Sequence, residues 1–165
     1  MSAKNNKFEW HRRVKRYLLW LWNFWPPFFG AGIQVKRIAQ DFTEIDVRLK
    51  HRFWNANYVG TAFGGSLFAM TDPFYMVMLY ETLGPGFVVW DKAARIDYLK
   101  PGQADMWAYF KLSQEQIEKF RSQAIAQGKY EPEMKVEIVD INKNIIAVVH
   151  KTLYIRVKNS SHAKK

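Results

Sequence analysis

Cysteine is absent from this chain of 165 residues, and histidine is scarce. Without a thiol there can be no disulfide, no cysteine nucleophile and no thiolate metal site. The four histidines are scattered, with no two at the spacing of metal ligands, so we expect no metal centre. They are His11, His51, His150 and His162. Carboxylates and backbone groups are therefore the first candidates for any chemistry.

Long apolar runs are absent as well. No stretch reaches the roughly 20 apolar residues that a membrane-spanning helix needs. A basic stretch and the apolar residues 17–22 are followed by aromatic residues and two prolines, whereas a signal peptide ends in small residues. We therefore expect a cytoplasmic protein, with peripheral contact to the inner membrane left open. The sequence also has no phosphate-binding loop and no dinucleotide fingerprint, so we expect no cofactor.

Positive charge exceeds negative charge. The formal net charge is +10, which implies an anionic partner: nucleic acid, an acidic membrane surface or a phosphorylated small molecule. Hydrophobic residues make up 48% of the chain, which excludes disorder and favours one folded domain. Aromatic residues interleaved with basic ones would suit nucleic acid, but the apolar stretches are better explained as a core. We therefore expect no nucleic-acid partner.

Charge is almost missing from the middle of the chain. Between Arg52 and Asp91 only Asp72 and Glu81 are charged, and Asp72 lies in an apolar run behind a Gly-Gly pair. A carboxylate in such surroundings is costly to desolvate unless another group holds it or the protein uses it. This segment is therefore the first place to look for chemistry. Glu81 should be solvated or salt-bridged near the end of a helix.

Residues 8–25 have the pattern of an amphipathic helix, which Pro26 and Pro27 should end. The apolar stripe consists of Trp10, Val14, Tyr17, Leu18, Leu21, Trp22 and Trp25, and the basic side of His11, Arg12, Arg13, Lys15 and Arg16. Two interpretations compete. The helix could cap the domain core, or it could lie on a membrane, where aromatic and basic residues are found side by side.

The remaining pattern predicts strands around one buried helix. Strands are expected at 33–38, 44–50, 87–99, 104–112, 135–141 and 145–158. Residues 65–83 are apolar on nearly every side, which predicts a helix buried on most faces. A capping box at Ser113 opens another helix, inserted between the strands and ending near Gly128. The expected fold is α+β, with a curved antiparallel sheet of about six strands wrapped around one long helix.

This pattern divides the chain into three parts. We expect an N-terminal basic and aromatic helix over 1–26, the α+β domain over 27–158, and a polar tail over 159–165.

Several short motifs resemble a known family. The pattern Asn57-x-x-Gly60-Thr61-x-Phe63-Gly64-Gly65, with Asp72 seven residues further on, resembles the Asn-x-x-Gly-Thr-x-His-Gly-Gly…Asp signature of hotdog-fold acyl-CoA thioesterases related to the phenylacetic-acid-pathway enzymes. Tyr98-Leu99-Lys100-Pro101 resembles their Tyr-Leu-x-Pro motif. Trp25-Pro-Pro-Phe, Gly30-Ala-Gly, Thr71-Asp-Pro-Phe-Tyr and Trp90-Asp-Lys are similar to a bacterial branch of that superfamily. The resemblance implies the hotdog fold.

The resemblance also implies a site. The family's helical Asp, a general base or nucleophile toward the thioester, corresponds to Asp72. The backbone N–H that faces the thioester oxygen corresponds to Gly64, and the upstream Asn that orients water or the carbonyl corresponds to Asn57. Substrate contacts are implied for Gly65, Thr61, Phe63, Asp91 and Lys92. A helix N-terminus suits this role because its unpaired N–H groups and positive dipole end stabilise a developing oxyanion.

Two positions depart from the family pattern. Phe63 stands where the family has His, which removes a polar group from the site. Asp91 aligns with a Ser or Thr that many relatives contribute from the neighbouring subunit.

Each site residue also has a structural alternative. Asp72 precedes a proline and could cap a second helical piece. Gly64 and Gly65 could serve close packing of helix on sheet. Asn57 could be a turn residue whose side chain is satisfied locally. Asp91 and Lys92 could form an ion pair with each other at a sheet edge.

The resemblance implies a homodimer or tetramer that hydrolyses acyl thioesters of coenzyme A or an acyl-carrier protein. Coenzyme A would enter as part of the substrate. The alternative is a non-catalytic acyl- or lipid-binding module, with weak membrane contact through residues 8–25.

Overall fold

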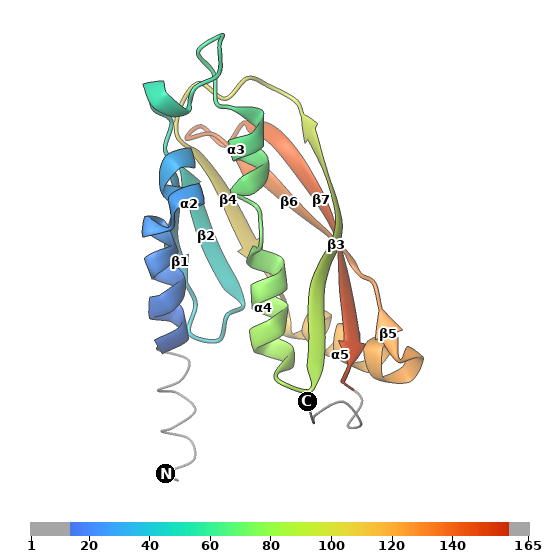
Figure 1. Cartoon of the computed structure of the whole chain (residues 1–165). Coiled ribbons are helices and arrows are strands. Elements are labelled where there is room, and N and C mark those ends of the chain that lie inside the picture. The colour runs from blue at the N-terminus through green and yellow to red at the C-terminus, as the bar shows by residue number, and fades with distance from the viewer. Residues whose placement is uncertain (1–13, 159–165) are drawn as a thin grey trace.

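The computed structural model describes residues 14–158, in which one antiparallel sheet and its helices form a single core (Figure 1). The strands are β1 (Ile33–Ile38), β2 (Glu44–Leu49), β3 (Phe87–Tyr98), β4 (Met106–Lys111), β5 (Lys129–Tyr130), β6 (Glu133–Val139) and β7 (Ile145–Val157). The order across the sheet is β1-β2-β4-β6-β7-β3, and β5 pairs with β7. The predicted sheet is confirmed, with the short β5 as an addition.

The alternation of apolar and polar residues determines which side of each strand is buried. On β2 the side chains of Ile45, Val47 and Leu49 are fully buried, and the intervening residues are partly exposed. Residues 140–144 join β6 and β7, which are neighbours in the sheet. Residues 99–105 join β3 and β4, which are not neighbours, because β6 and β7 lie between them.

The central helical segment crosses one face of the sheet in two pieces, α3 (Gly64–Ala69) and α4 (Phe74–Leu83) (Figure 1). The predicted span is confirmed, but residues 70–73 interrupt the helix. The N-cap of α4 is Pro73, which follows a cis peptide bond, and no side chain caps α4. The alternative in which the Asp72-Pro73 pair starts a second helical piece is therefore right about the break in the helix and wrong about Asp72 as its cap.

The helix α4 is covered on two sides. Phe74, Met78 and Leu79 are buried in the core. Its other side meets the N-terminal helix, where Leu19 joins the core and Trp22 packs against it. Lys15 forms an ion pair with Glu81 at 2.9 Å, as expected for a salt-bridged Glu81. These contacts support the interpretation of the N-terminal helix as a cap on the core.

The N-terminal region differs from the prediction in two details. Residues 14–21 are helical and η1 (Trp22–Phe24) follows, while residues 8–13 lie outside the described part. The prolines begin a new helix, α2 (Pro26–Ala31), because proline fits the first turn, where its missing N–H is not needed. The predicted stripe is partly wrong, since Tyr17 and Leu18 are 62% and 52% exposed. Leu19, outside that stripe, faces the core.

Side chains fix these peripheral elements to the sheet. Asn23 in η1 makes a reciprocal pair with Val35 on β1: its Oδ1 accepts from the Val35 N–H at 2.6 Å and its Nδ2 donates to the Val35 carbonyl at 3.2 Å. Asn55 in η2 (Phe53–Asn55) is buried and donates to the Ala31 carbonyl at 2.9 Å. None of the helices within residues 14–158 is long and apolar enough to cross a bilayer.

The predicted inserted helix, α5 (Gln114–Gln127), closes one end of the domain. The Ser113 hydroxyl accepts from the Gln116 N–H, and the Gln116 side chain accepts from the Ser113 N–H, which confirms the capping box. Arg121 donates to the carbonyls of Thr82 and Leu83, both at 3.1 Å. This places a cation at the C-terminal end of α4, where the helix dipole is negative.

Replacing Leu19 by Ala should lower the free energy of unfolding by about 2–4 kcal/mol, because a buried side chain is removed from the interface between the N-terminal helix and α4. The matched control is Leu18→Ala on the same helix, which should cost less than about 1 kcal/mol because Leu18 is half exposed. Urea denaturation followed by circular dichroism measures both. Equal losses for the two variants would show that the helix is not a cap.

Candidate active site

A cavity of about 370 Å³ opens beside the first turn of α3. Asn57, Thr61 and Gly64 line it, together with Leu67 and residues 98–102 at the end of β3. Those last residues contain the Tyr-Leu-x-Pro motif, so the two parts of the signature, far apart in the sequence, meet at one place. Gly65, Phe63, Asp72, Asp91 and Lys92 are not among the residues that line this cavity.

Asn57 shapes the loop that leads into α3. Its Oδ1 accepts from the backbone N–H groups of Val59 and Thr61, each at 3.1 Å, and its Nδ2 donates to Thr61 Oγ1 at 2.8 Å. The side-chain amide is therefore engaged at both ends within its own loop. This geometry matches the turn role that the sequence left open, and it buries Thr61 beneath the loop.

Close packing explains both glycines at the start of α3. The Tyr98 hydroxyl donates to the Gly64 carbonyl at 3.0 Å, and a Cβ on Gly64 would lie 3.0 Å from that hydroxyl oxygen. A Cβ on Gly65 would collide with the ring of Phe63. The Phe63 ring is itself 57% exposed, in front of the helix rather than in the core. Gly64 therefore permits the close approach of α3 and β3, and Gly65 leaves room for the Phe63 ring.

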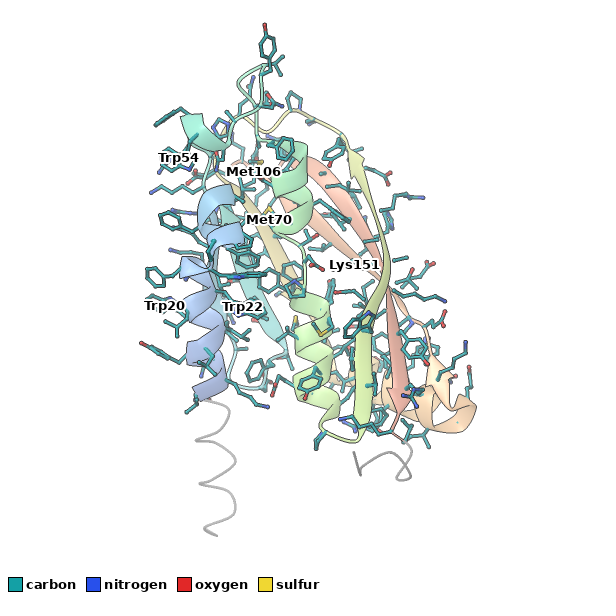
Figure 2. The ribbon with its side chains drawn as sticks, viewed as in Figure 1. Trp20, Trp22, Trp54, Met70, Met106 and Lys151 are labelled. Carbon is teal, nitrogen blue, oxygen red and sulfur yellow. The ribbon has the colours of Figure 1, made fainter. Side chains whose placement is uncertain are left out.

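A second group of site residues lies at the break between α3 and α4. There the buried ammonium of Lys151, from β7, faces two carboxylates (Figure 2). Its Nζ lies 2.8 Å from Asp72 Oδ1 and 3.3 Å from Asp91 Oδ1. The side chain of Lys151 is 2% exposed and that of Asp72 is 61% exposed. Asp72 is thus open to solvent on one side and held by a buried cation on the other.

Asp91 is the less exposed carboxylate of this group, with 24% of its side chain exposed against 61% for Asp72. Burial raises the pKa of the Asp91 carboxyl above its ordinary value of 3.8; the Lys151 ammonium opposes this shift and the Asp72 carboxylate adds to it. Asp91 Oδ1 is buried and has no hydrogen-bond partner of suitable geometry, although Lys151 lies at ion-pair distance. The group therefore combines one cation with two carboxylates in different environments.

The expected ion pair between Asp91 and Lys92 is wrong. Successive residues of a strand point to opposite faces, so Asp91 turns to Lys151, whereas Lys92 pairs with Glu131 at 2.5 Å. Lys151 was missed by the sequence analysis, although a signal existed. Val149 and Leu153 on the same face of β7 are fully buried, and the period of two puts Lys151 between them.

The fold defines the class of protein. It is the hotdog fold, and solved hotdog structures superpose on this chain at low sequence identity. A Pseudomonas aeruginosa protein of unknown function, named a probable thioesterase, has a TM-score of 0.68 at 18% identity and covers 78% of this chain and 85% of its own. PaaI of Escherichia coli, from the phenylacetic acid degradation operon, has a TM-score of 0.60 at 18% identity, covering 93% and 96%. A thioesterase of Haemophilus influenzae has a TM-score of 0.59 at 14% identity, covering 82% and 85%.

Within this class, the chain belongs to the family described as a domain of unknown function, DUF4442, which matches residues 14–155. The match extends from the N-terminal helix to the last strand, so it includes both groups of site residues. No curated protein matches the sequence.

The difference in free energy of unfolding between Asp91→Asn and the wild type should shift in favour of the variant as the pH increases from about 3 to 7. The folded protein holds the Asp91 proton more tightly than the unfolded chain does, so the wild-type stabilisation from Asp91 is lost as the pH rises through its raised pKa. Chemical denaturation at several pH values measures the difference. The control, Asp97→Asn on the same strand, removes a half-exposed carboxylate and should show no comparable trend. A difference that shrinks toward neutral pH would contradict the assignment.

Proposed function

We propose that this protein hydrolyses acyl thioesters, with Asp72 as the base or nucleophile. The observation that carries the proposal is the environment of Asp72. Buried Lys151 holds this carboxylate at the break in the central helix, while most of the Asp72 side chain stays accessible to solvent. A catalytic carboxylate needs both properties, a fixed position and access to substrate. The thioesterase names of the solved hotdog proteins add support from the fold.

The chemistry would use one acid–base group and backbone donors. As a base, Asp72 takes a proton from water while the water oxygen attacks the thioester carbonyl carbon. The oxyanion that forms is directed to the backbone N–H of Gly64, and its collapse releases the thiolate. Lys151 keeps Asp72 oriented in this scheme. Asp91 is the second carboxylate beside the same ammonium.

The site would be assembled from two subunits. Asp72 does not line the cavity that Gly64 lines in the same chain, and we infer that Asp72 of one subunit acts with Gly64 of a second copy. In the described part of the chain, β3 ends the sheet with no further strand beyond it. Its residues 92–95 are exposed, and an uncovered strand edge is a template for pairing. We infer that β3 pairs with β3 of a second copy.

Coenzyme A fits the charge of the protein. Its phosphates would meet basic residues outside the site, so binding should weaken as salt screens the attraction. Binding of the apolar acyl chain would depend on burial of its surface instead of on charge.

One observation favours a second function, acyl binding without hydrolysis. Phe63, where the family has His, provides a half-exposed ring and no polar group at the start of α3. Assays of hydrolysis and of binding on the same acyl-CoA panel distinguish the two functions. Tight binding without turnover by the wild type would assign the second.

Asp72→Asn should lower kcat/KM for acyl-CoA hydrolysis by about 10²–10⁴-fold, because the base is lost while the shape of the side chain is kept. The variant should fold but lose some stability, since Asp72 is one of the two carboxylates beside the buried Lys151 ammonium, so the rate is measured under conditions in which the unfolding curve shows the variant to be folded. The control is Asp46→Asn on β2, which breaks an exposed ion pair with Arg37 and should leave the rate unchanged. An Asp72→Asn variant as active as the wild type removes Asp72 from the reaction.

Ala94→Glu should convert the dimer to monomer and abolish hydrolysis, because it places like charges opposite each other where two β3 strands pair. Sedimentation velocity gives the mass and the acyl-CoA assay gives the activity. The control, Ala104→Glu, changes an exposed alanine in the loop before β4 and should affect neither. A monomeric wild type that hydrolyses acyl-CoA would refute the shared site.

A further inference from the structure

Seven large aromatic side chains are exposed on the N-terminal side of the domain. We call them the aromatic face: Tyr17, Trp20, Phe24, Trp25, Phe29, Phe53 and Trp54. Their exposed fractions range from 46% for Trp20 to 88% for Phe53. They come from the helix over 14–21, from η1 and α2 that follow it, and from η2, which comes after β1 and β2. Monomeric soluble proteins rarely leave so many large apolar side chains uncovered in one region.

These elements lie along one side of the molecule, away from the edge strand β3 (Figure 1). Trp20 and Trp54 point outward from that side, whereas Trp22 points inward to the core (Figure 2). The rings of Tyr17 and Trp20 stack at 6.2 Å, and Trp20 meets Phe24 edge-on at 5.6 Å. The exposed rings therefore form a surface of their own, distinct from the inferred dimer edge.

The charged residues within the two segments that carry this surface are all basic. The sequence contains no Asp or Glu from residue 10 to residue 40, nor from residue 47 to residue 71, and these two segments supply the whole aromatic face. Within them, Arg16 and Lys36 line a hollow of about 500 Å³ beside Tyr17 and Trp20. An occupant of this surface must therefore accept both aromatic rings and positive charge.

We propose that the aromatic face docks this protein on the headgroup layer of an anionic lipid bilayer. Tryptophan and tyrosine are suited to this layer because their rings enter the acyl boundary while their polar N–H and O–H groups stay near water, and phenylalanine adds apolar surface. Arg16 and Lys36 meet lipid phosphates at the rim of the inserted rings. A second copy of this chain fits the surface poorly, since it would bring basic residues against basic residues.

The aromatic face extends well beyond the helix that the sequence predicts over residues 8–25, because α2 and η2 contribute Phe29, Phe53 and Trp54. It uses the face of the N-terminal helix opposite Leu19, so capping of the core and membrane contact occur together on one helix. Neither Asp72 nor the cavity beside α3 takes part. The proposal therefore stands whether or not the protein hydrolyses thioesters.

The test is sedimentation of the full chain with vesicles of phosphatidylcholine alone or mixed with phosphatidylglycerol. We expect binding to the mixed vesicles that weakens with salt, and little binding to phosphatidylcholine alone. The double variants Trp20→Gln with Phe24→Gln, and Phe53→Gln with Trp54→Gln, should each weaken binding by at least about tenfold. The controls Ile125→Gln and Ile141→Gln change exposed apolar residues elsewhere and should bind like the wild type. Thermal melts confirm that every variant folds.

Quenching by brominated lipids adds a readout of insertion. The loss of tryptophan fluorescence on mixed brominated vesicles should be smaller in Trp20→Phe and Trp54→Phe than in Trp90→Phe, an exposed tryptophan on β3. Three outcomes overturn the proposal. They are no sedimentation with anionic vesicles, equal binding by the aromatic variants and the wild type, and aromatic variants that lower the oligomeric state in solution. The last would assign the face to a second copy of the chain.

Discussion

The requirement to cover an apolar helix on every side governs this structure. In α4 every position except Glu81 and Thr82 carries an apolar or aromatic side chain. The sheet can bury only one side of such a helix, and the other side needs a second layer. The N-terminal helix supplies that layer through Leu19 and Trp22. Arg121 and the ion pair between Lys15 and Glu81 then add polar contacts at the end of α4. The central helix, the sheet and the N-terminal helix are thus one packing unit.

The break between α3 and α4 gives this apolar unit its polar centre. The helix is interrupted at residues 70–73, and Asp72, within this interruption, reaches Lys151 on the sheet. A continuous helix would hold Asp72 in a different position. A buried ammonium is costly unless carboxylates compensate it, and Asp91 and Asp72 do so from two different elements. The charges that carry the proposed chemistry are therefore also required by the burial of Lys151.

The two ends of the sheet serve different purposes. At the β1 end, Asn23 satisfies the backbone of Val35, so this edge is partly closed by the chain's own N-terminal segment. At the other end, β3 has no such cover among the described residues. An edge that is open on one side only favours a closed pair of subunits over a growing filament. The aromatic face lies on the closed side, so lipid contact and subunit pairing would not compete.

The sequence by itself determined the elements and the fold class, because the period of two, the apolar helix, the capping box and the Gly-Gly…Asp signature are local patterns. It could not determine the cluster of Asp72, Asp91 and Lys151, since these residues are brought together only by strand order and register, with β3 beside β7. It left open whether the helix breaks at Asp72 and Pro73, and it missed that Tyr17 and Leu18 are exposed. Spacing along a helix marks apolar positions, but which of them are buried depends on where the helix contacts the rest of the fold.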